Sequence, residues 1–413
     1  MLRKIPGRAR LDQGHRQRTQ PHADELIAPR IAPSLPAARS GRGMLKAPRA
    51  CGPRLPSFIE PAVSQHMIHR LPLAALALLT ACAVHAADSR TAFLKLLDRP
   101  RVPLAAAAGA PATKDGLVEI DFSFATEAGQ RVPGILVKPD ALGAAASSSV
   151  RRPAVIVLHG TGGNKEAERA LLIDYARAGL VGIAIDGRYH GARTQGGKAS
   201  KSTEYIAAIL RTFRTGQELP FFFDTAWDVM RLIDYLETRD DIDPRRIGLM
   251  GFSKGGIETY LAAAADPRVA VAVSCIGVQS FRWAVDNHSW QSRISTVQAA
   301  FNTAAQESGV ANPGADFVRT FYARVAPGID GAFDGPAMLP LIAPRPLLAI
   351  NGETDARTPL PGLQLCADAA RAAYHAAGAD EKFVLRVQPN TGHKVNPDSM
   401  VAAREWLVRW LKP

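Results

Sequence analysis

Six short, continuously apolar runs recur through the later part of the chain and constrain its fold more than any other feature. Between them lie helical stretches such as 224–239, in which Trp227, Met230 and Ile233 recur at helical spacing. Runs that are apolar on both faces suit strands covered by helices on both sides. The runs are 153–160, 180–186, 246–251, 269–275, 345–352 and 383–389, and the other helical stretches are 165–178, 255–265, 361–377 and 398–411.

Two further segments, 117–126 and 131–139, flank a turn at Gly129 and predict an antiparallel hairpin. Together with the six runs they predict an α/β fold, with a mostly parallel central sheet flanked by helices. In such sheets a ligand binds beyond the carboxyl ends of the strands. Candidate functional residues are therefore sought in the loops that follow each run.

The motif G-x-S-x-G at residues 251–255 places Ser253 between an apolar run and a helical stretch. The motif alone arises often by chance, but the change from strand to helix is the context of a nucleophile elbow. There a sharp turn strains the serine backbone, and glycines on either side avoid a collision with the neighbouring strand and helix. A serine that only capped the helix would not also need Gly256. We predict that Ser253 is a nucleophile.

A serine hydroxyl needs a base and an orienting acid, which follow an elbow in the order acid, then histidine. Asp355 and His393 each follow one of the last two apolar runs, so both are expected at strand carboxyl ends beside Ser253. Glu353 is an alternative acid, and His159 and His190 also lie in loops after strands.

The loop HGTGGNK, which begins at His159, supplies closely spaced glycines after the first of the six runs. We assign the backbone N–H of Thr161 as one oxyanion donor and that of Lys254, directly after the nucleophile, as the other. His159 is expected to hold this loop by a hydrogen bond. No GK[ST] sequence follows, so a phosphate-binding loop is not favoured.

The succession VIVLHGTGG, AIDGRYHG, RIGLMGFSKGG, AINGETD and TGH resembles the α/β-hydrolase superfamily, and within it the dienelactone-hydrolase-like and acetyl-xylan-esterase-like branches. The resemblance covers roughly residues 115–411. It implies the α/β-hydrolase fold and the triad Ser253, Asp355 and His393. Dienelactone hydrolases proper carry cysteine at the elbow, so Ser253 argues against that reaction.

The segment from about 276 to 344 is longer than a minimal core of this kind needs, and its helical character at 294–307 and 315–324 predicts an inserted helical lid over the strand ends. Trp283 and Trp290 either line an acyl or sugar site or anchor the lid to the core. Both interpretations remain open for these two side chains.

The first 86 residues are interpreted as a leader, and residues 87–413 as the folded domain. Residues 1–66 are rich in Pro and Arg and are interpreted as a disordered preface, translated from upstream of a true start at Met67. Residues 67–86 resemble a secretory signal peptide that is cleaved before Ala87. Two alternatives are a lipobox, with Cys82 lipidated and holding the protein at a membrane, and a buried apolar helix. The protein is thus expected to be exported, either periplasmic or secreted.

The net charge of +12 lies mostly in this leader, because residues 1–70 hold 13 Lys and Arg against 4 Asp and Glu, and the rest holds 37 against 34. We therefore predict no nucleic-acid partner. No metal-binding motif is present, and no metal or cofactor is predicted. Cys275 and Cys366, which remain after removal of the leader, are expected to be buried thiols.

These features predict an exported serine hydrolase that cleaves a carboxylic ester through an acyl-enzyme, with a small-molecule or acylated-sugar ester as substrate. One alternative is a serine peptidase resembling the prolyl oligopeptidases, although no long repeat array precedes residue 115. The other is a non-catalytic binding protein on a hydrolase scaffold.

Overall fold

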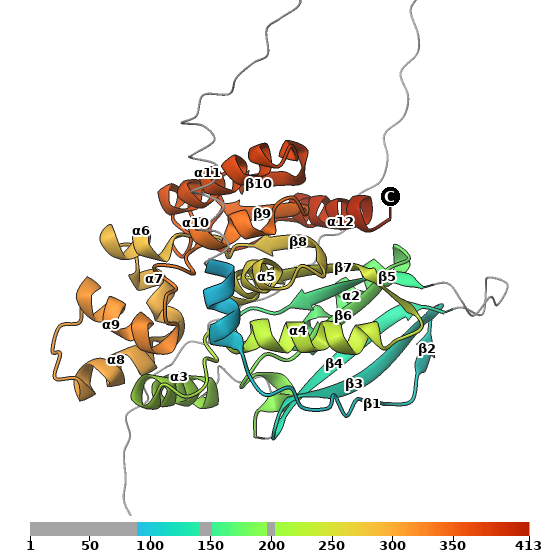
Figure 1. Cartoon of the computed structure of the whole chain (residues 1–413), viewed down its shortest axis with the longest axis horizontal. Coiled ribbons are helices and arrows are strands. Elements are labelled where there is room, and N and C mark those ends of the chain that lie inside the picture. Colours follow the sequence, from blue (N-terminus) through green and yellow to red (C-terminus); the bar gives the residue numbers. More distant parts are fainter. Residues whose placement is uncertain (1–88, 141–150, 196–202, 413) are drawn as a thin grey trace, which may run out of the picture. The chain divides into compact units, whose positions relative to one another are not determined.

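The computed structural model describes residues 89–140, 151–195 and 203–412, and the predictions for the leader lie outside these residues. Within them the chain forms a ten-stranded sheet in the order β1-β3-β4-β6-β5-β7-β8-β9-β10, with β2 paired to β3 (Figure 1). The strands are β1 Ala107–Ala108, β2 Ala112–Lys114, β3 Leu117–Glu127, β4 Gln130–Pro139, β5 Arg152–Leu158, β6 Val181–Ile185, β7 Ile242–Phe252, β8 Val269–Cys275, β9 Leu347–Gly352 and β10 Phe383–Gln388.

The sheet is parallel from β6 to β10, which confirms the predicted fold class. The predicted hairpin is β3 and β4, and β4 joins the parallel strands through an antiparallel pairing with β6. All six apolar runs form the parallel strands β5 to β10. Their carboxyl ends therefore lie along one edge of the sheet.

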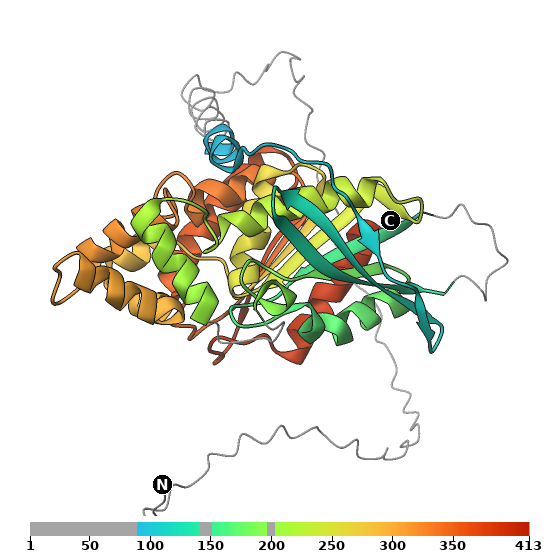
Figure 2. The same cartoon turned by 90° about the horizontal axis from the view of Figure 1, so that it is seen from below.

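Helices cover both faces of the sheet (Figure 2). On one face α2 and α12 pack against alternate strand residues such as Val155 and Met250. On the other face α4, α5 and α11 pack against residues such as Ile156 and Leu249, and residues 89–97 form a further helix there through Phe93. The bounds are α2 Arg169–Arg177, α4 Phe223–Glu237, α5 Lys254–Ala265, α11 Leu360–Ala376 and α12 Pro397–Leu411.

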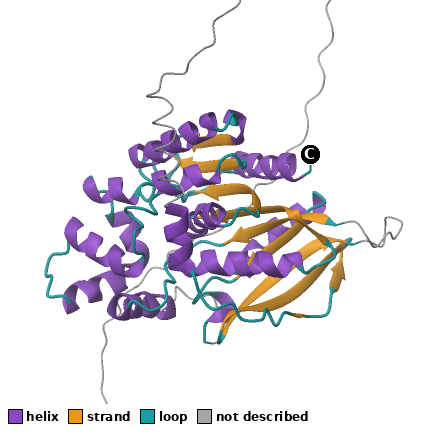
Figure 3. Cartoon of the chain, in the orientation of Figure 1, coloured by secondary structure: helices purple, strands orange, loops and turns teal. Residues whose placement is uncertain are grey.

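The segment between β8 and β9 is helical, as Figure 3 shows. Its helices are α6 Phe281–Asp286, α7 Gln291–Ile294, α8 Gln298–Glu307, α9 Ala315–Val325 and α10 Gly335–Met338. Short 3-10 helices span Lys165–Glu168, Gly191–Arg193, Ser295–Val297, Leu339–Ile342 and Asp380–Lys382.

The helix α3 (Thr203–Thr215) was not predicted, and it packs against α8 and α9 from far away in the sequence. The ring of Phe213 lies 6.1 Å from that of Phe317 and 5.7 Å from that of Phe321, measured between centroids. The inserted segment and α3 thus form one helical cluster.

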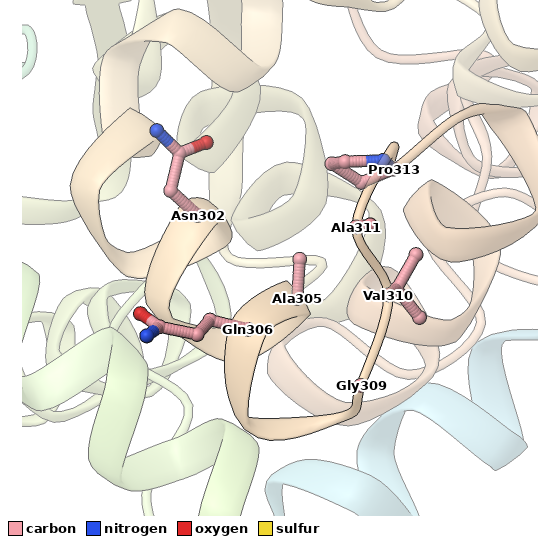
Figure 4. A pocket seen from close by; sticks show the side chains of 7 residues that line it. All are labelled: Asn302, Ala305, Gln306, Gly309, Val310, Ala311 and Pro313. Atoms are coloured by element: carbon pink, nitrogen blue, oxygen red, sulfur yellow. The ribbon is translucent and has the colours of Figure 1, made fainter.

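The surface of this cluster carries a hollow of about 480 Å³ between α8 and the loop that leads to α9 (Figure 4). No charged side chain lines it, so it offers no catalytic group. Its lining residues are Asn302, Ala305, Gln306, Gly309, Val310, Ala311 and Pro313.

A buried ion-pair network ties the hairpin to α4. Arg188, whose side chain is 2% exposed, pairs with Glu127 at the end of β3, and it faces Asp224 and Asp228 on α4 at 3.6 and 3.5 Å. Both aspartate side chains are fully buried. Asp224 also pairs with Arg99 at 2.5 Å and Asp228 with Arg193 at 2.6 Å, so Arg188 completes the neutralisation of the buried carboxylates.

Replacing Arg188 should therefore destabilise the fold strongly. In Arg188→Met the buried carboxylates lose a countercharge, and the free energy of unfolding should fall by about 3–5 kcal/mol in urea denaturation. Arg371→Met, at an exposed arginine paired with Asp368, is the matched control. Equal stability of the two variants would contradict this role for the network.

Candidate active site

Ser253 lies at the bend between β7 and α5 in a strained backbone conformation, with φ 54° and ψ −111°. Such a positive φ is unfavourable for any residue that carries a Cβ. The bend is held because the N–H of Ser253 donates to the carbonyl oxygen of Cys275 at 2.9 Å. It also lifts the serine side chain above the carboxyl ends of the strands.

Glycines are required around the bend because neighbouring backbone passes close by. A Cβ on Gly255 would collide with the carbonyl groups of Leu158 and His159, and one on Gly256 would lie 2.5 Å from the carbonyl oxygen of Cys275. The helix α5 can therefore begin directly beneath the sheet edge only with these glycines, as predicted from the motif.

The structure brings Ser253, His393 and Asp355 together in one hydrogen-bonded chain. Nε2 of His393 lies 2.7 Å from Oγ of Ser253, and Nδ1 lies 2.7 Å from Oδ2 of Asp355. Because the carboxylate can only accept, Nδ1 carries the proton and Nε2 is free to accept the serine proton. Asp355 follows β9 and His393 follows β10, so the order of the sheet brings both beside the bend.

Asp355 is held in its charged form by hydrogen bonds. Its side chain is fully buried, which by itself disfavours the charge, but His393, the N–H of Arg357 at 2.9 Å and the hydroxyl of Thr358 at 2.8 Å all donate to it. Together these donors outweigh burial and hold the pKa of Asp355 below its ordinary value. The carboxylate is thus fixed in both charge and orientation.

Glu353 and His159, the alternatives to Asp355 and His393, make other hydrogen bonds. Glu353 is exposed and accepts a hydrogen bond from the N–H of Asn390. His159 holds its own loop, because it accepts from the N–H of Gly187 at Nε2 (3.0 Å) and donates from Nδ1 to the carbonyl of Gly160 (2.8 Å). Its expected structural hydrogen bond is therefore present. Cys275 and Cys366 are free, buried thiols, as predicted.

The backbone N–H groups of Thr161 and Lys254 lie in the two segments that flank the serine. A Cβ on Gly160 would lie 3.6 Å from Cβ of Ser253, so the loop of Thr161 passes beside the bend. Lys254 is the first residue of α5, where backbone N–H groups have no acceptor within the helix. Both N–H groups are thus on segments that adjoin Ser253, as the predicted oxyanion role requires.

The side chain of Lys254 is buried beneath the site, which sequence reasoning missed. It is 2% exposed, pairs with Glu258 one turn further along α5, and lies 5.8 Å from the ring centroid of Tyr205. Burial raises the pKa of Glu258 to about 7. The spacing of Lys254 and Glu258 was the available signal, but such pairs usually lie on exposed helix faces.

Trp283 and Trp290 are both half-buried and packed within or against helices. Trp283 lies against the start of α11, where a Cβ on Gly362 would be 3.2 Å from Cε3 of its ring. Trp290 contacts Phe301 on α8, with 6.0 Å between the ring centroids, and its indole N–H has no acceptor among the described residues. In the described part of the chain, no group of three His, Cys, Asp or Glu side chains is arranged to hold a metal ion.

The known proteins to which this chain is similar are named as esterases or as a hydrolase. The family model of fungal glucuronyl esterases matches residues 197–378. YtaP of Bacillus subtilis (strain 168), a protein named as a hydrolase, is 26% identical over 295 residues, which cover 68% of this chain and 84% of that protein.

Solved structures are similar over most of the chain. Acetyl xylan esterase 1 from Thermoanaerobacterium sp. JW/SL YS485 superposes with a TM-score of 0.58 at 18% identity, covering 80% of this chain and 94% of that one. A glucuronoyl esterase from Solibacter usitatus gives 0.52 at 16% identity, covering 78% and 92%. At these identities the solved structures establish the shared fold.

Acid should destabilise the protein through His159. Burial lowers the pKa of His159 to about 4, below its ordinary value of 6.5, so between these values the unfolded chain binds a proton that the folded chain does not. The free energy of unfolding should therefore fall with decreasing pH in this window, by about 1.4 kcal/mol per pH unit from this group.

Urea denaturation across this pH window tests the effect. His159→Gln should show a shallower dependence than the unmodified protein. The same slope in both proteins would show that His159 does not contribute.

Proposed function

We propose that this chain, a carboxylic ester hydrolase of the α/β-hydrolase superfamily, acts through Ser253, His393 and Asp355 and forms an acyl-enzyme. The observation that carries the proposal is the unbroken hydrogen-bonded chain from Oγ of Ser253 through the imidazole to the buried carboxylate. A serine at a strained bend, with a base and an oriented acid in line, is the arrangement that activates a hydroxyl for acyl transfer.

In the proposed mechanism Oγ of Ser253 attacks the ester carbonyl while Nε2 of His393 takes its proton. Asp355 stabilises the resulting imidazolium, and the N–H groups of Thr161 and Lys254 donate to the oxyanion of the tetrahedral intermediate. The imidazolium then protonates the departing alcohol. A water molecule, deprotonated by His393, releases the acid and restores Ser253.

For the substrate, we propose an acylated-sugar or other small ester. The matches to glucuronyl and acetyl xylan esterases support a sugar ester, since those proteins are named for such substrates. In this proposal the helical segment 276–344 acts as a lid over the strand ends. Trp283 and Trp290 then either line the acyl or sugar site or fix the lid to the core.

We also propose that the protein is exported, through a signal peptide at residues 67–86. Of the helices in the described residues, none has the length and apolar character that a membrane crossing requires. Mass spectrometry of the protein from its native host would distinguish a mature chain that begins at Ala87 from one lipidated at Cys82.

Removing any member of the triad should nearly abolish ester hydrolysis. Ser253→Ala, His393→Ala and Asp355→Asn should each lower kcat for a p-nitrophenyl ester by on the order of 10,000-fold, because the three groups act as a unit. A fluorophosphonate probe should label the unmodified protein and fail to label Ser253→Ala.

The control is Glu353→Gln, which removes a carboxylate two residues from Asp355 and should retain activity. If Glu353→Gln were as inactive as Asp355→Asn, the acid would be wrongly assigned. A folded protein that is neither labelled nor active would favour a binding function.

The reaction class is tested by a panel of p-nitrophenyl esters, acetylated xylan and aminoacyl anilides. We expect hydrolysis of the esters with little or no cleavage of anilides, because an ester carbonyl is attacked more readily than an amide carbonyl and the family model that matches is that of glucuronyl esterases. A higher kcat/KM for anilides than for esters would replace the esterase proposal by a peptidase.

A further inference from the structure

Arg293, the third residue of α7, is buried and almost without partners. Its exposure is 3%, and its only acceptor among the described residues is the carbonyl oxygen of Arg357, 3.2 Å from Nη2. Its Nε has no acceptor, and no carboxylate of the described residues lies within ion-pairing distance. A guanidinium presents five N–H donors, and burying it without a counterion is costly.

Other buried arginines of this chain have several ion-pair or hydrogen-bond partners. Arg188 faces three carboxylates, and Arg345 donates to four backbone carbonyl groups. Burial lowers the pKa of Arg293, and the nearby Tyr322 and Asp355 only partly oppose this shift. Arg293 thus has neither the ion pairs of Arg188 nor the four backbone acceptors of Arg345.

A second cation adjoins the first in the loop of the catalytic acid. Arg357 lies two residues after Asp355, and its backbone accepts from Arg293 and donates to Asp355. Its own side chain has no carboxylate partner in the described part of the chain, and its Nε is buried without an acceptor. Asp355 already accepts from His393 and Thr358, so it is committed to the triad.

Two neutral polar side chains on neighbouring segments also lack hydrogen-bond partners. Gln279, which follows β8, is 1% exposed, and neither its amide nitrogen nor its amide oxygen has a partner among the described residues. Trp290, directly before α7, likewise has a buried indole N–H without an acceptor. The carboxyl end of β8 lies beside that of β9, which leads to Asp355. Gln279 and Trp290 thus add two unmatched polar groups on segments that lie between β8 and β9.

We propose that Arg293 and Arg357 bind a carboxylate group of the substrate, so that the enzyme selects esters that carry a free acid on either the acyl or the alcohol part. A carboxylate supplies the missing negative charge, and its two oxygens match the planar N–H groups of a guanidinium. The inference rests on the proposed esterase function and adds the substrate class to it.

Two matched pairs of esters test the proposal on both sides of the scissile bond. Monomethyl glutarate and dimethyl glutarate differ by a charge on the acyl side, and 4-acetoxybenzoate and methyl 4-acetoxybenzoate differ by one on the alcohol side. For each pair, kcat/KM of the charged ester is divided by that of the neutral ester. Activity of the unmodified protein on the neutral esters reports on the esterase function separately.

In at least one pair this ratio should fall by roughly 10- to 100-fold in Arg293→Gln and Arg357→Gln, the usual loss for a hydrogen bond to a charged group. Arg293→Lys, which keeps the charge, should retain part of the ratio. Arg371→Gln removes an exposed positive charge on α11 and should leave the ratio unchanged.

Thermal melting identifies any variant that fails to fold. If Arg293→Gln does not fold, Arg357→Gln carries the test, since its side chain is only partly buried. A ratio that stays constant in both pairs for the folded variants would overturn the proposal. The two arginines would then serve only to hold the segment 276–344 against the loop of Asp355.

Discussion

Ser253 is held in a strained backbone conformation by close packing on both of its sides, and the rest of the site is built around that bend. A residue at such a φ costs on the order of 1–3 kcal/mol, which the surrounding structure must outweigh. β5 and β8 do so here, because the glycines of the bend lie against their backbones and Cys275 accepts the N–H of Ser253. The same bend starts α5 and points its free N–H groups toward the serine side chain.

Several charged side chains are buried around the bend, and most of them are paired. Lys254 and Glu258 form a buried pair on α5 directly beneath Ser253, and His159 and Asp186 hold the loops beside it. Paired buried charges fix geometry more than they add stability. Arg293 departs from this pattern, and this difference is the basis of the proposed carboxylate site.

The periodicity of the sequence was sufficient to predict the strands and most helices of the core, because parallel strands and their covering helices differ in apolar spacing. It could not predict that β4 pairs with β6, since pairing depends on contacts between distant segments. The helix α3 was missed although Tyr205, Ala208, Ile209 and Thr212 form a buried stripe, because that stripe is completed only by α8 and α9.

The candidate triad followed from the order of loops along the chain, because each loop after a parallel strand ends at the same edge of the sheet. The burial of Lys254 and Arg293 could not be predicted from that order. Lysine and arginine are normally exposed, and only the tertiary structure shows that these two side chains are enclosed. Sequence thus locates the candidate reacting groups better than the groups that surround them.

The most direct test of the central claim, that His393 activates Ser253 as a nucleophile, is to trap the covalent intermediate. The protein is mixed rapidly with a p-nitrophenyl ester, quenched in acid, digested and sequenced by mass spectrometry. We predict an initial burst of p-nitrophenol and an acyl group on the peptide that contains Ser253, both absent in His393→Ala. An acyl group on another residue, or the same acylation of Ser253 in His393→Ala, would contradict the account.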